Sequence, residues 1–198
     1  MSDIICITNR ALCKEPFLER IEKLAAAHPR AIVLREKDLN ENEYKSLAKK
    51  VLEICNDYNT PCILHSFTET AIDLTADAIH LPLHILRTLS SREKSKFSVI
   101  GASCHSKEDA IEAENSGCTY ITAGHIFNTD CKKGLPGRGL DFLKEVCESI
   151  SIPVYAIGGI NADNICAVKN TGAAGACIMS SAMLCDNPQE YFNTFEEK

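Results

Sequence analysis

Short apolar runs recur along the chain, and most are followed by a segment whose apolar residues have helical spacing. The runs lie at residues 4–8, 31–34, 61–65, 78–81, 97–101, 120–123, 152–157 and 176–179. Their apolar residues are continuous rather than alternating, which indicates strands that are buried on both faces. Strands of this kind occur in parallel sheets covered by helices. The pattern therefore predicts an α/β protein.

Eight strand–helix units favour a single (β/α)8 TIM barrel that spans residues 1–198. We expect helices at residues 16–25, 41–58, 68–75, 85–94, 110–116 and 140–149, one closed by Gly172, and one at the C-terminus. Ser106 is expected to cap the helix that follows it, and Asn161 or Asp163 the helix that Gly172 closes. A doubly wound open sheet is the alternative, but its usual Gly-x-Gly-x-x-Gly is absent after the first run.

Composition excludes several classes of protein. The net charge of -6 argues against general nucleic-acid binding. No run approaches the roughly 20 apolar residues of a membrane span, and no basic region precedes the first apolar run as in a signal peptide. The 11 cysteines include no Cys-x-x-Cys, and their odd number without a secretory signal points to a reducing cytoplasm. We expect no metal site and no cofactor.

Polar residues follow the ends of most predicted strands, where barrels place their functional groups. They are Arg35, Lys37, His65, His80, Ser103, His105, His125, Gly158, Gly159, Ser180 and Ser181. The two glycines would let the backbone approach a ligand, and the two serines would offer free N–H groups at a helix start. These four residues together predict a phosphate site after the last two strands.

The loop at residues 124–139 combines one imidazole, His125, with anion-binding groups at Thr129, Lys132, Lys133 and Arg138. Glycines at its end are expected to make its tail mobile. A proton-transfer group beside anion-binding groups is what a lid over a phosphorylated substrate requires. The alternative is an ordinary solvated basic loop.

Several other residues have two interpretations. His65, His80 and His105 compete with His125 as proton-transfer groups, or are strand-end histidines held by hydrogen bonds. His80 and His84 have the spacing of a helical metal pair, but Pro82 lies between them. Cys104 beside His105 suggests a nucleophilic thiol, but neighbours on a strand point to opposite sides, which argues against a working pair. Arg35 and Lys37 share one side and either bind an anion or pair with Glu36.

Four motifs resemble the thiamine phosphate synthase superfamily over nearly the whole chain. They are Leu-Arg-Glu-Lys at 34–37, Gly-His-Ile-Phe-Asn-Thr-Asp-Cys-Lys-Lys-Gly at 124–134, Pro-Val-Tyr-Ala-Ile-Gly-Gly-Ile at 153–160 and Met-Ser-Ser at 179–181. The synthase branch binds Mg²⁺ through an Asn-Asp pair after the third strand and an acidic residue past the fourth. Here His65-Ser66 and the segment 80–84 supply no carboxylate, and Val33 replaces the usual Gln. The resemblance therefore implies weak Mg²⁺ binding.

The TenI-type thiazole tautomerases form the other branch, in which a His replaces the Pro of Gly-Pro-Ile-Phe and no metal is needed. This chain has His125 there. The resemblance implies aromatisation of a carboxylated thiazole ethyl phosphate, with His125 as acid and base. Gly158, Gly159, Ser180 and Ser181 would bind the phosphate, and Thr129 and Lys132 would hold an anionic end of the substrate. Arg35, Lys37 and Ser103 would line the ring pocket.

Two other functions stay open. The chain could be a working synthase that recruits its metal through other residues, or a non-catalytic regulatory protein that binds a phosphorylated ligand. A homodimer is the usual expectation for this fold.

Overall fold

The computed structural model describes residues 3–129 and 134–196, and these form a closed barrel of parallel strands. Each strand pairs with the next along the chain, and β8 closes the circle by pairing with β1. The strands are β1 Ile4–Ile7, β2 Ala31–Leu34, β3 Cys62–His65, β4 Ala78–Pro82, β5 Val99–Cys104, β6 Tyr120–Gly124, β7 Val154–Ile157 and β8 Gly175–Ile178. The predicted (β/α)8 barrel is confirmed.

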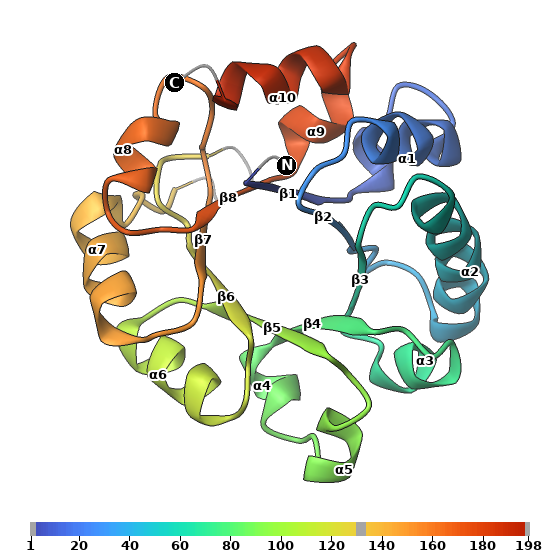
Figure 1. Ribbon diagram of the computed structural model, residues 1–198, viewed down its shortest axis with the longest axis horizontal. Helices are drawn as coiled ribbons and strands as arrows, with labels where there is room; N and C mark the ends of the chain where they lie inside the picture. The colour runs from blue at the N-terminus through green and yellow to red at the C-terminus, as the bar shows by residue number, and fades with distance from the viewer. Residues whose placement is uncertain (1–2, 130–133, 197–198) are drawn as a thin grey trace.

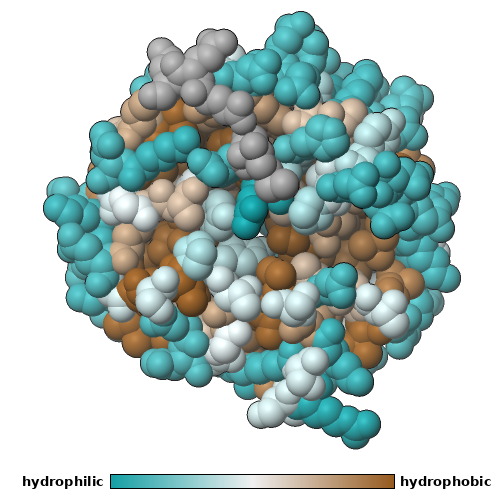
Figure 2. Space-filling view, viewed as in Figure 1, coloured by the Kyte–Doolittle hydropathy of each residue, from teal (hydrophilic) through white to brown (hydrophobic). Residues whose placement is uncertain are grey.

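Helices surround the barrel in a ring (Figure 1). They are η1 Arg10–Leu12, α1 Phe17–Ala26, α2 Glu41–Asp57, α3 Thr68–Asp73, α4 Leu83–Leu86, α5 Ser91–Lys94, α6 Lys107–Asn115, α7 Gly139–Ser149, α8 Ile165–Lys169, α9 Ser180–Leu184 and α10 Pro188–Glu196. The strands follow one another clockwise in Figure 1, and βαβ crossovers are right-handed. The view is therefore onto the amino ends of the strands. Figure 2 shows the same face, with hydrophilic residues around its rim and apolar and pale residues nearer its centre.

The apolar side chains form two concentric cores. The inner one fills the barrel with inward-facing side chains such as Ile5, Val33, Ile63, Tyr120 and Tyr155. The outer one lies between the strands and the helices. Burial on both faces explains why the strands read as continuous apolar runs.

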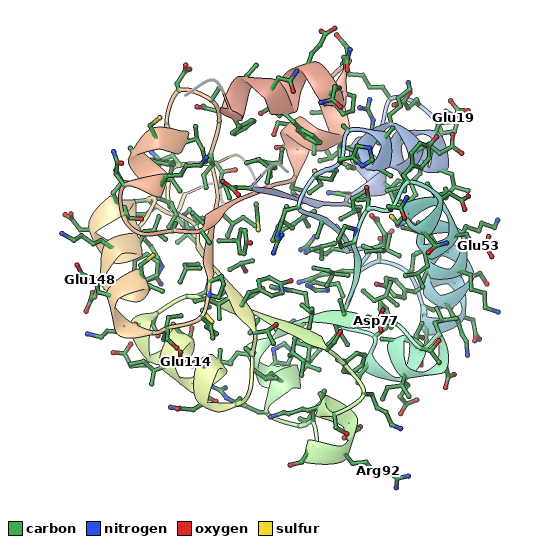
Figure 3. All side chains as sticks on the ribbon, viewed as in Figure 1. Glu19, Glu53, Asp77, Arg92, Glu114 and Glu148 are labelled. Carbon is green, nitrogen blue, oxygen red and sulfur yellow. The ribbon has the colours of Figure 1, made fainter. Side chains whose placement is uncertain are left out.

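Charged side chains lie on the outer faces of the helices, as Glu19, Glu53 and Glu148 show on α1, α2 and α7 (Figure 3). Within residues 3–129 and 134–196, no helix is both long and apolar enough to cross a bilayer.

Three sequence-based boundaries need correction. The fifth strand runs from Val99 to Cys104, because Phe97 packs in the outer core instead of entering the strand. The helix expected at 85–94 is divided into α4 and α5, because Ser90 forms a capping box with Glu93 and starts a new helix.

The start of α8 also differs, since its N-cap residue is Asn164 rather than Asn161 or Asp163. The Asn161 side chain instead accepts a hydrogen bond from the backbone N–H of Asp163. The predicted cap at Ser106 is confirmed, because its hydroxyl accepts from the Asp109 N–H.

Candidate functional site

A cavity of about 1250 Å³ opens at the carboxyl ends of the strands, and every strand contributes a side chain to its wall. The sequence-predicted residues among its lining are Arg35, Lys37, His65, His80, Ser103, His105, His125, Thr129, Gly158, Gly159, Ser180 and Ser181. The structure thus brings together the described residues predicted for the site, with the exception of Arg138. Lys132 and Lys133 lie outside the described residues.

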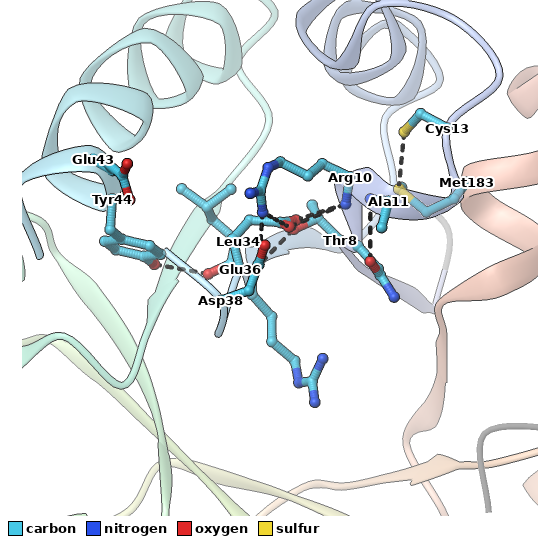
Figure 4. A network of polar contacts seen from close by, with 12 residues as sticks. Thr8, Arg10, Ala11, Cys13, Leu34, Glu36, Asp38, Glu43, Tyr44 and Met183 are labelled. Atoms are coloured by element: carbon cyan, nitrogen blue, oxygen red, sulfur yellow. Dashed lines mark hydrogen bonds and ion pairs between the residues drawn. The ribbon is translucent and has the colours of Figure 1, made fainter. Parts of the chain in front are cut away.

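Two cations, Arg35 and Lys37, line one wall of the cavity beyond β2. Glu36, between them, is 2% exposed and turned the other way, where its Oε1 accepts from the Thr8 hydroxyl at 2.6 Å (Figure 4). The backbone N–H of Arg10 donates to Oε2 of Glu36 at 3.0 Å. The guanidinium group of Arg10 lies 3.3 Å from the same oxygen. The alternative in which Glu36 pairs with its neighbours Arg35 and Lys37 is therefore wrong. The ion pair of Glu36 runs to Arg10.

Two stacked imidazoles, His65 and His80, lie beside this cationic wall with ring centroids 5.7 Å apart. His65 Nδ1 lies 2.7 Å from the Ser66 hydroxyl. His80 Nδ1 lies 2.9 Å from the Tyr120 hydroxyl, and its Nε2 lies 2.8 Å from the Ser103 hydroxyl. The interpretation of His80 as a strand-end histidine held by hydrogen bonds agrees with this geometry.

Both rings are held neutral. Burial lowers the pKa of His65 to about 2, with further lowering by His80, Arg35 and Lys37. Burial also lowers the pKa of His80 to about 3, and the positive charge of Arg35 adds to the effect. A charged imidazole loses hydration in the barrel and meets cations there, so the neutral form is favoured.

These neutral imidazoles should make stability depend on pH. In the unfolded chain a histidine binds a proton near its ordinary pKa of about 6.5, whereas the folded protein binds none until the pH is far lower. The contribution of the neutral imidazoles to the free energy of unfolding is therefore fully present above a pH of about 6.5 and is lost as the pH falls below it. When the pH is lowered from about 7 to about 5, each of the two histidines should lower the free energy of unfolding by about 2 kcal/mol. Urea unfolding of wild type and His65→Gln at both pH values measures this loss, which should be smaller in the variant. An equal loss of unfolding free energy in the two proteins would contradict the prediction.

His125 follows β6 and lies directly against Gly158, which follows β7. A Cβ atom on Gly158 would lie only 2.5 Å from the His125 Cβ. The backbone continues this contact, since Ile126 N–H donates to Ile157 O and Phe127 N–H donates to Gly158 O. His125 Nε2 lies 3.3 Å from the Leu135 carbonyl oxygen, which suits an Nε2–H donor and leaves the lone pair on Nδ1. The imidazole is thus fixed beside the glycine pair.

The end of the His125 loop is tied to its beginning. Arg138 N–H and Gly139 N–H donate to the carbonyls of His125 and Ile126, and Gly137 N–H donates to the Asn128 side chain at 2.8 Å. A Cβ atom on Gly137 would lie 2.5 Å from the Ile126 carbonyl oxygen. The expectation of a mobile tail is therefore wrong at 137–139, where the missing side chain permits close backbone contact.

Arg138 does not join the cavity. Its guanidinium carbon lies 4.8 Å from the centroid of the Phe142 ring, on the first turns of α7. The prediction that Arg138 is one of the anion-binding groups of the loop is therefore not supported by its position, because a cation–π contact holds it over Phe142.

Small and hydroxylated residues form the opposite side of the cavity. Gly158 and Gly159 both have positive φ, at 104° and 67°, and a Cβ on Gly159 would lie 2.7 Å from the Asn128 carbonyl oxygen. Ser180 and Ser181 begin α9 beside them. Tyr191 from α10 also lines the cavity.

The donor set of the cavity does not suit a divalent metal. Mg²⁺ requires oxygen ligands, chiefly carboxylates, yet no described residue of the lining is Asp or Glu. The residues 3–129 and 134–196 also contain no cluster of three metal-ligating side chains. Arg35 and Lys37 would in addition repel a cation at this wall. His84 is exposed on α4 and away from buried His80, so these two do not form a metal pair.

Cys104 and His105 point to opposite sides, as expected from their adjacency on a strand. Cys104 packs in the outer core, and burial raises the pKa of its thiol to about 12. His105 Nδ1 lies 3.0 Å from the Gly124 carbonyl oxygen at the mouth of the barrel. A thiolate–imidazole pair is therefore excluded here.

Sequence reasoning missed the parts of the site that do not follow a strand end. Thr122 lines the cavity, and Tyr120 packs in the inner core of the barrel. Both lie on the same side of β6 as Gly124, so the alternation of side chains along this strand could have identified them. Tyr191 lies on a helix that is distant in sequence, and no local signal marks it.

A family model described as thiamine monophosphate synthase matches residues 4–182. The chain belongs to this family. Thiamine-phosphate synthase 2 of Streptococcus pneumoniae is 32% identical over 198 aligned residues, which cover 97% of this chain and 92% of that protein. A thiamine-phosphate synthase of Clostridium tetani is 30% identical and covers 94% of each chain. Membership places the chain among the enzymes of thiamine biosynthesis.

A solved structure of thiamine phosphate pyrophosphorylase from Pyrococcus furiosus superposes with a TM-score of 0.83. It is 29% identical, and the match covers 98% of this chain and 93% of that one. The Streptococcus and Clostridium relatives carry the synthase name, and none of these comparisons separates the synthase from the tautomerase branch of the superfamily. That distinction depends on the residues of the cavity.

Proposed function

We propose that the protein is a metal-independent thiazole tautomerase that aromatises a carboxylated thiazole ethyl phosphate. One observation carries the proposal: the described lining of the cavity holds an imidazole, His125, against the glycine pair and contains no carboxylate. This arrangement suits proton transfer on a phosphorylated ligand and does not suit a metal-assisted departure of pyrophosphate.

In the proposed reaction, the lone pair of neutral His125 removes the proton from the ring carbon that bears the carboxylate. The electron pair of that C–H bond moves through the conjugated ring and makes it aromatic. The exocyclic carbon then takes the proton back from the imidazolium. One group acts as base and then as acid, so atoms and charge balance without a co-reactant.

The remaining cavity residues bind and orient the substrate in this proposal. Gly158 and Gly159 allow the phosphate to approach the backbone, and Ser180 and Ser181 donate hydroxyl or amide hydrogens to it. Arg35 and Lys37, on the opposite wall, attract the ring carboxylate. Thr129 lines the mouth and would contact an anionic end of the substrate. The ligand is thus a phosphorylated small molecule, and the homodimer stays a prediction.

The second candidate is thiamine phosphate synthase, which the names of the relatives favour. It joins a pyrimidine diphosphate to a thiazole phosphate and releases pyrophosphate with Mg²⁺. The two candidates are separated by assaying one purified sample both ways. We expect tautomer conversion in excess EDTA and no Mg²⁺-dependent pyrophosphate release; the reverse pattern assigns the synthase function. Tight binding of the carboxythiazole phosphate without either turnover would indicate a regulatory protein.

A further inference from the structure

Tyr120, His80 and Ser103 are linked by two hydrogen bonds, and burial of these residues determines which group donates in each bond. Within the described part of the chain, the Tyr120 hydroxyl has one hydrogen-bond partner, Nδ1 of His80 at 2.9 Å. Tyr120 is 6% exposed, and burial raises the pKa of its phenol, which therefore keeps its hydrogen. A buried hydroxyl hydrogen without an acceptor is costly, so Tyr120 must donate to Nδ1.

The proton on His80 must then be on the other nitrogen. A neutral imidazole has one N–H, and Nδ1 is already an acceptor, so Nε2 carries the hydrogen. It donates to the Ser103 hydroxyl oxygen at 2.8 Å. Within the described ranges, the Ser103 hydroxyl has no other hydrogen-bond partner, and Ser103 lines the cavity. The hydroxyl hydrogen of Ser103 is consequently left for a ligand.

Packing holds this chain of groups in place. A Cβ atom on Gly101 would lie 2.2 Å from the Tyr120 ring, so only a glycine leaves room for the ring there. The Tyr120 and Tyr155 rings form a T-shaped pair, with centroids 5.9 Å apart and an angle of 88° between the ring planes. His65 stacks on the His80 ring. Neither the phenol nor the imidazole is free to turn away.

We propose that Tyr120 and His80 are positioning residues, which make the Ser103 hydroxyl a hydrogen-bond donor aimed at an acceptor atom on the heterocyclic end of the ligand. The identity of that end rests on the proposed function. The arrangement selects ligands with a ring heteroatom or carboxylate oxygen at this point and disfavours those that present an N–H donor there. A mismatched donor would leave two hydrogens facing each other.

The proton arrangement can be measured in the ligand-free protein. Long-range proton–nitrogen NMR of histidine-labelled protein distinguishes the two neutral tautomers, and the signal lost in His80→Asn assigns His80. We expect the Nε2–H form in wild type. In Tyr120→Phe the donor to Nδ1 is gone, so the Nδ1–H form should become populated. An Nδ1–H tautomer in wild type overturns the proposal.

Ligand binding tests the role of Ser103. The probes are thiazole ethyl phosphate with and without the ring carboxylate, titrated calorimetrically. Ser103→Ala and Tyr120→Phe should each weaken binding roughly tenfold, which corresponds to about 1.4 kcal/mol. The double variant should be little worse than Ser103→Ala alone, because both changes remove one donor. Tyr155→Phe, which contacts the Tyr120 ring and not His80, is the matched control and should bind as wild type.

The two probes locate the acceptor. If Ser103→Ala loses affinity for both probes, the acceptor atom lies on the ring. If it loses affinity for the carboxylated probe alone, the acceptor is a carboxylate oxygen. Either result supports the proposal. Unchanged binding by Ser103→Ala, or additive losses in the double variant, overturns it. If wild type binds neither probe, the thiazole ligand and the proposed function fail together, while the NMR experiment still decides the tautomer of His80.

Discussion

Replacement of His125 by alanine should slow tautomer conversion by roughly 10²- to 10⁴-fold, the usual contribution of a positioned acid–base group. The loss should appear in kcat, because the proton transfer fails while the phosphate and carboxylate contacts remain. Folding should be little affected, since the His125 side chain is partly exposed at the mouth of the cavity. Proton NMR of the thiazole substrate measures the rate directly.

His84→Ala is the matched control for this experiment. His84 is an exposed histidine on α4 that does not line the cavity. It should convert the substrate at the wild-type rate. A His125→Ala enzyme that retained near-normal turnover would exclude His125 as the acid and base and would direct attention to His105, the other imidazole at the mouth.

Replacement of Gly158 by alanine should damage both activity and stability. Its φ of 104° strains any side chain, at a cost of about 1–3 kcal/mol. The added methyl group would also lie 2.5 Å from the His125 Cβ and 2.9 Å from its Cα, so the imidazole must shift. A displacement of about 1 Å in a reacting group can cost roughly 10² in rate. Steady-state kinetics and urea unfolding measure the two effects.

Gly117→Ala separates the strain from the displacement of His125. Gly117 follows the C-cap residue of α6 with a similar φ of 90°, but nothing lies within 4 Å of an added Cβ. This variant should lose stability from backbone strain alone and keep full activity. If Gly117→Ala and Gly158→Ala had the same turnover, the contact between Gly158 and His125 would have no part in catalysis.

The barrel was predictable because its rules are local. Buried strands need continuous apolar runs, and the strand ends of a barrel share one face, so residues as distant as Arg35 and Ser180 could be assigned to one site. Helix boundaries were predicted wrongly where a single N-cap residue determines the start of a helix. Ser90 divides one expected helix in two, and Asn164 rather than Asn161 or Asp163 begins α8.

The interior of the site was harder to predict, because it depends on contacts between strands. The sequence left His80 open between a proton-transfer group and a strand-end residue. Only the structure shows that Ser103 and Tyr120 occupy its two nitrogens. Glu36 likewise adjoins two cations in sequence, but alternation along the chain turns it toward Thr8 and Arg10 instead.

The most direct test of the account follows the thiazole substrate by NMR in D₂O with excess EDTA. A proton shift through His125 without a metal predicts conversion to the aromatic carboxythiazole phosphate in wild type, with hydrogen from the ring carbon transferred to the exocyclic carbon. His125→Ala should show neither. Conversion that stops in EDTA, or no conversion in a sample that releases pyrophosphate from the synthase substrates with Mg²⁺, would contradict the account.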